Sequence, residues 1–321
     1  WLDRNTLRPV FCVDDTKYIT SPSKISTSTI GDEMKVSTNG ASIIYSIASQ
    51  RESAVLSAGH AADGAYWIDD KTGELTTSSY YSEKSHSWLK AFNKNNKQIC
   101  DNKSNKNAYV IYAAKKCISD NAMGKDDISD MISISLSAKG KDATNWQTEM
   151  ESIYMQLDNM LSDLITNLEN DLGKNNVLFV VTSTGFKDEK NVDYDKYRIP
   201  TGTFYINRTA NLLNIYLGAI YGQGRYVETC FRNEIYLNRK LIEQKRISLN
   251  DILSRSQEFI ILNAGVKDVF TSERLIAGGN DIQYIRNGYN PTISGDIIIE
   301  VAPGWQLLNE DNQENYTSRA C

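Results

Sequence analysis

The chain has 321 residues, 40% of them hydrophobic and 23% charged, which is an ordinary composition for a globular protein. Its net charge of −5 and isoelectric point near 5.3 exclude a nucleic-acid-binding role, because contacts to phosphates need a basic face. No apolar run approaches the about 20 residues that span a bilayer, so we expect no transmembrane segment in this chain. The length fits one large α/β domain with a smaller insertion, or two domains.

The first half of the chain contains several strand signals. Apolar and β-branched residues predict strands at residues 42–47, 108–113 and 131–137. Residues 67–75 predict a hairpin whose turn is built on Asp69 to Gly73.

A long amphipathic helix follows. Residues 148–151, Thr-Glu-Met-Glu, match a capping box and predict the start of this helix. Apolar residues then recur at helical spacing up to Gly173, which predicts a helix packed on a sheet. These residues are Met150, Ile153, Tyr154, Leu157, Met160, Leu161, Leu164, Ile165 and Leu168.

Residues 177–181, Val-Leu-Phe-Val-Val, predict a buried parallel strand that delivers its next residues into a glycine turn. Strand, long helix and strand together predict a βαβ crossover, so the loops after the strands at 131–137 and 177–181 should open at one edge of the sheet. Ligands and catalytic groups sit at that edge in open α/β folds. The residues delivered there are Thr182, Ser183 and Thr184, which include no carboxylate, imidazole or thiol.

Further elements follow downstream. Residues 210–221 and 249–262 predict helices, and residues 266–271 and 296–301 predict strands. The chain therefore reads as an α/β protein.

The histidines and cysteines limit the chemistry available to this chain. His60 and His86 are its two histidines, so it cannot provide three imidazoles to a metal site. We expect His60 to be a hydrogen-bonded structural residue and His86 a surface residue. Cys100 and Cys117 flank a polar stretch, and either close it with a disulfide or remain two inert thiols.

Several segments match a known family. Residues 27–35, 57–67 and 72–73 resemble the alkaline-phosphatase superfamily, and residues 236–242 and 294–305 extend the match almost to the end of the chain. More narrowly, they resemble the phosphate-irrepressible phosphatases and the nucleotide pyrophosphatase/phosphodiesterase relatives of Bacteroidetes-type bacteria. The resemblance implies an α/β/α sandwich with a mostly parallel sheet over residues 1–321, with a cap or insertion region at residues 186–262.

The resemblance also implies a site, and this chain departs from it. Such enzymes hold two zinc ions with Asp and His, use a Thr or Ser nucleophile, and clamp the phosphoryl group with a Lys-x-Arg motif. The corresponding metal positions here carry Gly140, Thr144, Ser183 and Thr184, and the clamp positions carry Gln50, Arg51 and Glu52. Glycine and neutral hydroxyls are poor zinc ligands, and Glu52 would repel a phosphoryl dianion. We therefore expect no zinc and no catalytic residue. The family's nucleophile and last histidine would lie outside this chain, so we expect it to be the middle of a longer protein.

Two functions remain open at this point. The first is a catalytically inactive phosphatase-like protein that acts as a binding or scaffold subunit of a bacterial cell-envelope assembly, with protein partners and no cofactor. The alternative is a metal-dependent phosphoric-ester hydrolase with a rearranged site for Mg²⁺ or Ca²⁺. Its candidate ligands are the acidic residues Asp142, Asp188, Asp193 and Asp195, besides Glu189, Asp126, Asp127 and Asp130.

We also expect a particular cellular location and two surfaces that bind partners. The resemblance implies a periplasmic, outer-membrane-associated or extracellular protein of a Gram-negative bacterium. Aromatic residues often anchor interfaces, which suggests two partner surfaces. One comprises Tyr80, Tyr81, Trp88 and Phe92, and the other comprises Tyr216, Tyr221 and Tyr226.

Overall fold

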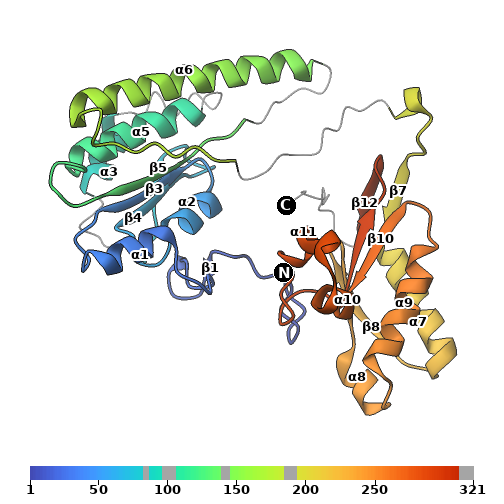
Figure 1. The fold of residues 1–321 in the computed structure, drawn as a ribbon. Coiled ribbons are helices and arrows are strands. Elements are labelled where there is room, and N and C mark those ends of the chain that lie inside the picture. The colour runs from blue at the N-terminus through green and yellow to red at the C-terminus, as the bar shows by residue number, and fades with distance from the viewer. Residues whose placement is uncertain (82–86, 96–105, 139–144, 184–193, 311–321) are drawn as a thin grey trace. The chain divides into compact units, whose positions relative to one another are not determined.

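A computed structural model describes the chain except for residues 82–86, 96–105, 139–144, 184–193 and 311–321 (Figure 1). Its contacts divide the chain into two compact units. One unit is Phe11–Val181, called the 11–181 unit below. The other combines Trp1–Val10 with Thr182–Cys321 and is called the 182–321 unit. Each unit is described by itself, and the predicted cap role of residues 186–262 stays a prediction.

The 11–181 unit is built on a sheet with strand order β5-β4-β3-β6. Its strands are β3 (Ile44–Ala48), β4 (Gly64–Ile68), β5 (Leu75–Thr76) and β6 (Met131–Ser135), besides the short pair β1 (Asp14–Asp15) and β2 (Ile19–Thr20). Its helices are α1 (Ile30–Ser37), α2 (Arg51–Ala58), α3 (Ser87–Asn95), α5 (Lys106–Asp120) and α6 (Trp146–Leu172). Strand β3 runs parallel to both β4 and β6, and β5 closes a hairpin with β4.

Both faces of this sheet are covered, which is why β3 and β4 are buried along their whole length. Tyr45 and Ile47 of β3 point into a core shared with α3, α5 and the end of α6. Ile44 and Ala48, on the opposite face of the strand, pack with α2. The layers are therefore helix, sheet and helix (Figure 1).

The 182–321 unit contains an antiparallel sheet of order β10-β11-β9-β8 and a parallel pair, β12-β7. Its strands are β7 (Gly202–Tyr205), β8 (Val227–Phe231), β9 (Glu234–Leu237), β10 (Val266–Thr271), β11 (Ile297–Val301) and β12 (Trp305–Leu308). Its helices are α7 (Ile206–Tyr221), α8 (Arg239–Gln244), α9 (Leu249–Ile261), α10 (Ser272–Ala277) and α11 (Gln283–Arg286), with short 3₁₀ turns at Asp195–Tyr197 and Asn280–Ile282. Helices α7 and α9 pack on one another and share one apolar core with the strands.

Two predicted strands are wrong. Residues 108–113 lie inside helix α5, where Tyr109, Val110, Ala113 and Cys117 are buried at helical spacing. Residues 177–181 form no strand, and Leu178, Val180 and Val181 are exposed. A strand needs a hydrogen-bonded neighbour, and in the described part of the chain no strand pairs with this segment. The predicted crossover from β6 through α6 is therefore not formed.

Helix α6 also differs from the prediction. It begins at Trp146, one turn before the expected start, so Thr148 lies inside the helix and caps nothing. It ends as predicted before Gly173. Its buried residues Leu164 and Leu168 pack in the core with α5, so the helix rests on another helix and not on the sheet. None of the described helices is long and apolar enough to cross a membrane.

Candidate functional site

The carboxyl ends of the parallel strands in the 11–181 unit are where the fold would place a site. The chain leaves β3 at Ala48 and enters α2 at Arg51, so Gln50, Arg51 and Glu52 stand at this edge. Gln50 is the N-cap residue of α2, but its side chain makes no capping hydrogen bond. The structure thus places this triplet after the carboxyl end of β3, and its match to the family's phosphate clamp stays a prediction.

Arg51 is held by carboxylates of the protein itself. Its Nη2 atom lies 2.8 Å from Oδ1 of Asp14 and 3.1 Å from Oε1 of Glu52. Its Nη1 atom also donates to the Thr20 hydroxyl at 3.4 Å. One guanidinium between two carboxylates leaves a local charge of about −1, which opposes binding of a phosphoryl dianion. The sequence alone did not reveal the contribution of Asp14, which arrives from the β1–β2 hairpin.

A second carboxylate of this hairpin is held by local hydrogen bonds. Asp15 Oδ2 accepts hydrogen bonds from the hydroxyls of Ser21 at 2.6 Å and Ser23 at 2.8 Å. The Ser21 hydroxyl, together with the Tyr18 amide, holds the pKa of Asp15 well below its usual range. The carboxylate is therefore ionised at neutral pH, and both serine hydroxyls are used as donors to it.

His60 has the structural role that the sequence predicts. Its Nδ1 atom lies 3.1 Å from Oδ2 of Asp32, and its Nε2 atom lies 3.2 Å from the Ile25 carbonyl oxygen. Asp32 also accepts the backbone amides of His60 at 2.8 Å and Ala61 at 2.7 Å. Since protein oxygens engage both ring nitrogens, neither is available to a metal.

Asp32 was missed as an organising residue, although its spacing gave a signal. Thr29 and Asp32 form a reciprocal capping box at the start of α1, which the Thr-x-x-Asp pattern matches. Burial raises the pKa of Asp32, but the amides of Thr29 and Ala61 and the His60 ring outweigh it and lower the pKa to about 2.

Of the four positions matched to metal ligands, Ser183 alone lies among the described residues. Ser183 is exposed and lies outside any helix or strand, whereas Gly140, Thr144 and Thr184 lie outside the described residues. Among the described residues no group of three or more His, Cys, Asp or Glu side chains could hold a metal ion. The donors present in this part of the chain do not fit the two zinc ions that the resemblance implies.

Three acidic residues of the alternative site, Asp126, Asp130 and Asp195, have positions that the structure describes closely. Asp130 accepts the amides of Ile43 at 2.6 Å and Gly124 at 2.8 Å, so it is a structural residue. It precedes β6, which places it at the sheet edge opposite the Arg51 end, because β3 and β6 are parallel. Asp126 accepts the Ile128 amide at 2.9 Å and closes a turn. Asp195 belongs to the 3₁₀ turn Asp195–Tyr197, while Asp142, Asp188, Glu189 and Asp193 lie outside the described residues.

The expected aromatic surfaces need correction, and of the two alternatives for Cys117 the structure shows the free thiol. Tyr81, Trp88, Phe92 and Tyr226 are buried in the cores and cannot anchor a partner. Cys117 is a free thiol buried in α5, and its burial raises its pKa, so it is inert and forms no disulfide. Cys100 and His86 lie outside the described residues.

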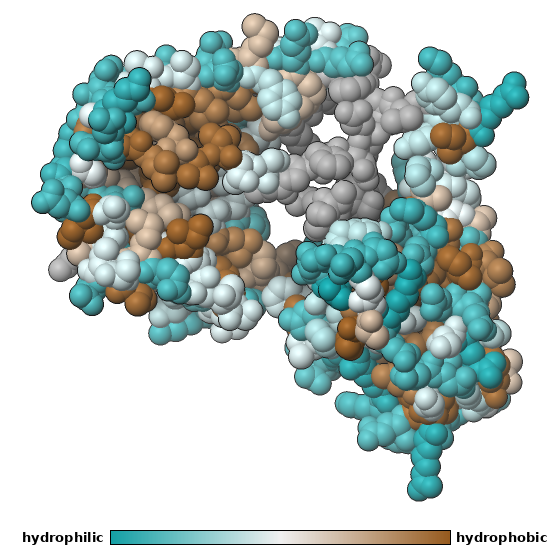
Figure 2. Space-filling view, in the orientation of Figure 1, coloured by the Kyte–Doolittle hydropathy of each residue, from teal (hydrophilic) through white to brown (hydrophobic). Residues whose placement is uncertain are grey.

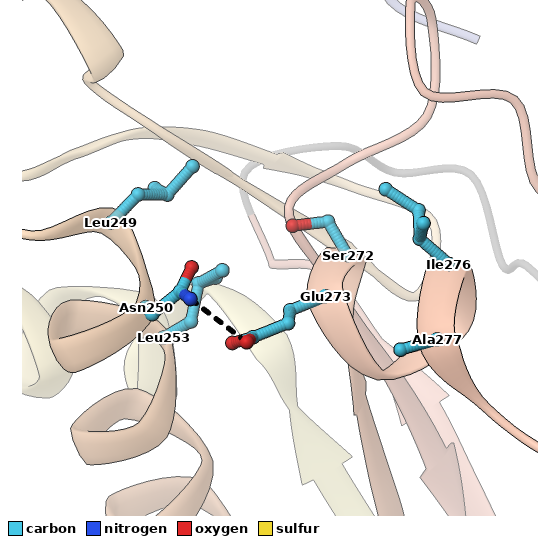
Figure 3. A pocket seen from close by; sticks show the side chains of 7 residues that line it. All are labelled: Leu249, Asn250, Leu253, Ser272, Glu273, Ile276 and Ala277. Atoms are coloured by element: carbon cyan, nitrogen blue, oxygen red, sulfur yellow. Dashed lines mark hydrogen bonds between the residues drawn. The ribbon is translucent and has the colours of Figure 1, made fainter.

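A pocket of about 230 Å³ lies in the 182–321 unit between α9 and α10 (Figure 3). Its lining residues are Leu249, Asn250, Leu253, Ser272, Glu273, Ile276 and Ala277. The Asn250 amide donates to Glu273 at 2.8 Å across the opening. Its lining contains no histidine or lysine that could activate the Ser272 hydroxyl, so the pocket offers no nucleophilic chemistry.

The comparisons with known proteins agree on one family. A family model for type I phosphodiesterase / nucleotide pyrophosphatase matches residues 1–320. Alkaline phosphatase PafA of Elizabethkingia meningoseptica is 24% identical over 375 residues, covering 95% of this chain and 68% of the relative. A protein named calcium-transporting ATPase from Myroides odoratus is 24% identical (91% and 65% covered), and alkaline phosphatase PhoV of Synechococcus elongatus is 22% identical (95% and 67% covered). The chain thus spans about two thirds of the length of these relatives.

Solved structures show the same fold. The crystal structure of wild-type PafA superposes with a TM-score of 0.77 at 21% identity, covering 99% of this chain and 74% of that chain. A mutant of PafA gives 0.74 at 22% identity, covering 97% and 72%. The predicted α/β fold and the resemblance to the alkaline-phosphatase superfamily are therefore confirmed.

Proposed function

Because the chain belongs to the type I phosphodiesterase / nucleotide pyrophosphatase family, we propose that it is a member that has lost phosphoester hydrolysis and acts as a binding or scaffold subunit. Phosphoester hydrolysis is the activity that its relatives support at the level of the family. We infer the loss of hydrolysis from the residues of this chain and not from its relatives. In keeping with the resemblance, we place the protein in a cell-envelope assembly of a Gram-negative bacterium, with other proteins as partners.

This proposal rests on the ion pairs that Arg51 makes with carboxylates of the protein itself. Arg51 stands at the sheet edge where the phosphoryl group would be held, and Asp14 and Glu52 already neutralise it. A phosphate dianion would have to displace two carboxylates from one guanidinium. The positions matched to zinc ligands offer only glycine and hydroxyl groups, so no residue in them supplies the charge that metals or imidazoles would bring.

The alternative function is hydrolysis with Mg²⁺ or Ca²⁺ at a rearranged site of carboxylates. Family membership favours it, and a hard cation needs only oxygen ligands. Asp142, Asp188 and Asp193 would have to converge with Asp195 for such a site to form.

The test measures metal content and hydrolysis on the same sample. The protein is purified without chelator, analysed by elemental mass spectrometry, and assayed with p-nitrophenyl phosphate and bis-p-nitrophenyl phosphate with added Zn²⁺, Mg²⁺ or Ca²⁺. We expect no stoichiometric metal and rates equal to those of the Arg51→Ala variant. Two bound zinc ions, or turnover that Arg51→Ala removes, would overturn the proposal. Turnover with Mg²⁺ or Ca²⁺ that survives Arg51→Ala but is lost in Asp195→Asn would establish the alternative.

A further inference from the structure

Helix α6 extends well beyond the helix that supports it (Figure 1). Its 27 residues make it about 40 Å long, whereas the 15 residues of α5 span about 22 Å. Leu164 and Leu168, in the C-terminal half, are the buried residues that join the core with α5. Among the described elements, α5 is the one with which α6 packs extensively. The N-terminal half of α6 thus has no described helix or strand packed along it.

This N-terminal half nevertheless continues the apolar stripe. Met150, Ile153, Leu157, Met160 and Leu164 follow one another at spacings of three and four residues, the pattern of a coiled-coil seam. Ile153 and Leu157 are partly accessible and belong to none of the core clusters, and the neighbouring Tyr154 is 59% exposed. A helix with an apolar stripe normally buries it against another element. The stripe therefore has the form of a docking seam.

The charge of the helix determines which partner fits. Every charged residue of α6 is acidic: Glu149, Glu151, Asp158, Asp163, Glu169 and Asp171. In the described part of the chain, Glu151, Asp158 and Asp163 have no ion-pair partner. Figure 2 shows a largely hydrophilic surface along α6 at the top of the view. Two copies of this helix would place like charges together, which disfavours self-association.

We propose that the N-terminal half of α6 docks a basic amphipathic helix of another protein. The apolar stripe would bury the partner's apolar face, and the acidic side chains of the helix would attract its lysine and arginine side chains. Met150 makes the seam adaptable in shape, because methionine fills irregular gaps. This surface on α6 would serve the proposed binding role, and its assignment rests on that role. It stands on contacts separate from the Arg51 edge.

The experiment uses a defined probe and the whole chain. A three-heptad helical peptide with leucine at the seam and lysine beside it is compared with the same peptide carrying glutamate in place of lysine, by fluorescence anisotropy. We expect saturable binding of the lysine peptide alone, which weakens as salt is added. Failure of the lysine peptide to bind, or equal binding of both peptides, would overturn the proposal.

Matched variants locate the binding. Reversing charge with Glu151→Lys, Asp158→Lys and Asp163→Lys should weaken the lysine peptide about tenfold or more. The same reversal at the exposed acids Glu243, Glu258 and Asp281 of the other unit should change it little. Ile153→Ser with Leu157→Ser should also abolish binding while circular dichroism shows the helix retained. An equal loss in the control reversal would overturn the assignment to α6.

Two further measurements, light scattering and hydrolysis, distinguish the remaining outcomes. If light scattering shows a dimer that Ile153→Ser with Leu157→Ser dissociates, the seam belongs to a second copy and the proposal is wrong. Hydrolysis of the nitrophenyl phosphates is measured on the same samples. Peptide binding with active hydrolysis would refute the inactive role alone, and inactivity without binding would refute the docking seam alone.

Discussion

Asp32 joins two segments of the 11–181 unit through one carboxylate. It lies in the first turn of α1 and accepts amides from Thr29 at its own helix start and from His60 and Ala61 after α2. Replacing it with asparagine turns one acceptor oxygen into a donor that faces other donors. We expect Asp32→Asn to cost about 3 kcal/mol of unfolding free energy. Hydrogen exchange of residues 29–61 measures this loss of stability. The variant Glu33→Gln, at an exposed neighbouring residue, is the control and should stay near wild type.

The same carboxylate makes stability depend on acid pH. The pKa of Asp32 falls from its ordinary value of 3.8 to about 2 in the folded protein. Because the pKa of Asp32 is lower in the folded protein than in the unfolded chain, the ionised carboxylate stabilises the fold fully above about pH 5. This stabilisation is lost as pH falls from about 4 through 2. Thermal unfolding between pH 6 and 2 should therefore show a smaller loss below about pH 4 in Asp32→Asn than in wild type. Parallel curves would contradict this assignment.

Gly59 is a position where only glycine fits beside this carboxylate. Its φ of +78° lies in the left-handed region, and a Cβ there would lie 2.2 Å from Thr29 Oγ1 and 2.8 Å from Asp32 Oδ2. Gly40 has a φ of +84° but nothing within 4 Å of its Cβ position. Gly40→Ala should thus cost about 1 kcal/mol for backbone strain alone, and Gly59→Ala clearly more, about 3 kcal/mol. Urea unfolding of both variants checks the difference, and equal costs would contradict it.

At the scale of elements, α6 is stabilised along only part of its length. Leu164 is 5% exposed in the core with α5, whereas Ile153 belongs to none of the described clusters. Leu164→Ala should cost about 3 kcal/mol through lost burial and a cavity. Ile153→Ala should cost less than about 1 kcal/mol. Chemical denaturation followed by circular dichroism compares the two, and a cost at Ile153 equal to that at Leu164 would show that the N-terminal half is packed in the isolated chain.

The segment at residues 177–181 shows why element prediction fails at a particular place. Its composition favours a strand, and its side chains alternate in burial, with Phe179 packed against the core and Leu178 and Val180 exposed. Strand formation also needs a neighbouring backbone, which is a property of the whole sheet. By contrast, β3, β6 and β10 lie within a few residues of their predicted bounds, because each pairs with a neighbouring strand of a formed sheet.

Across the whole molecule, the first ten residues contact segments far away in the sequence, and Arg4 and Asp296 are 292 positions apart. Asp296 is fully buried and lies 3.0 Å from Arg4 Nη1 and 2.6 Å from Arg239 Nη2, and it accepts the Leu237 amide at 2.8 Å. Leu2 adds apolar contact with Phe231 and Tyr236. These contacts explain why Trp1–Val10 belongs to the 182–321 unit.

Removing the buried carboxylate should therefore destabilise that unit. Asp296→Ala leaves two guanidinium groups and a buried amide without their acceptor, so we expect a loss of about 3–5 kcal/mol. Hydrogen exchange should show it in β9, β11 and residues 1–10, with β3 of the 11–181 unit unchanged. Asp281→Ala, an exposed acid of the same unit, is the control. A change of equal size in β3 would contradict the assignment of the effect to the contacts of Asp296 within the 182–321 unit.

The family and the α/β class could be predicted from the sequence alone, because they depend on local motifs and on residue types. The sequence also indicated that this chain offers too few imidazoles for a two-zinc site. The tertiary structure decided three other features: the neutralisation of Arg51 by Asp14, the helical state of residues 108–113, and the unpaired state of residues 177–181. The physical reason is common to all three. Each depends on contacts between residues far apart in the chain, and local propensity does not specify which distant segment will be present to pack, pair or neutralise.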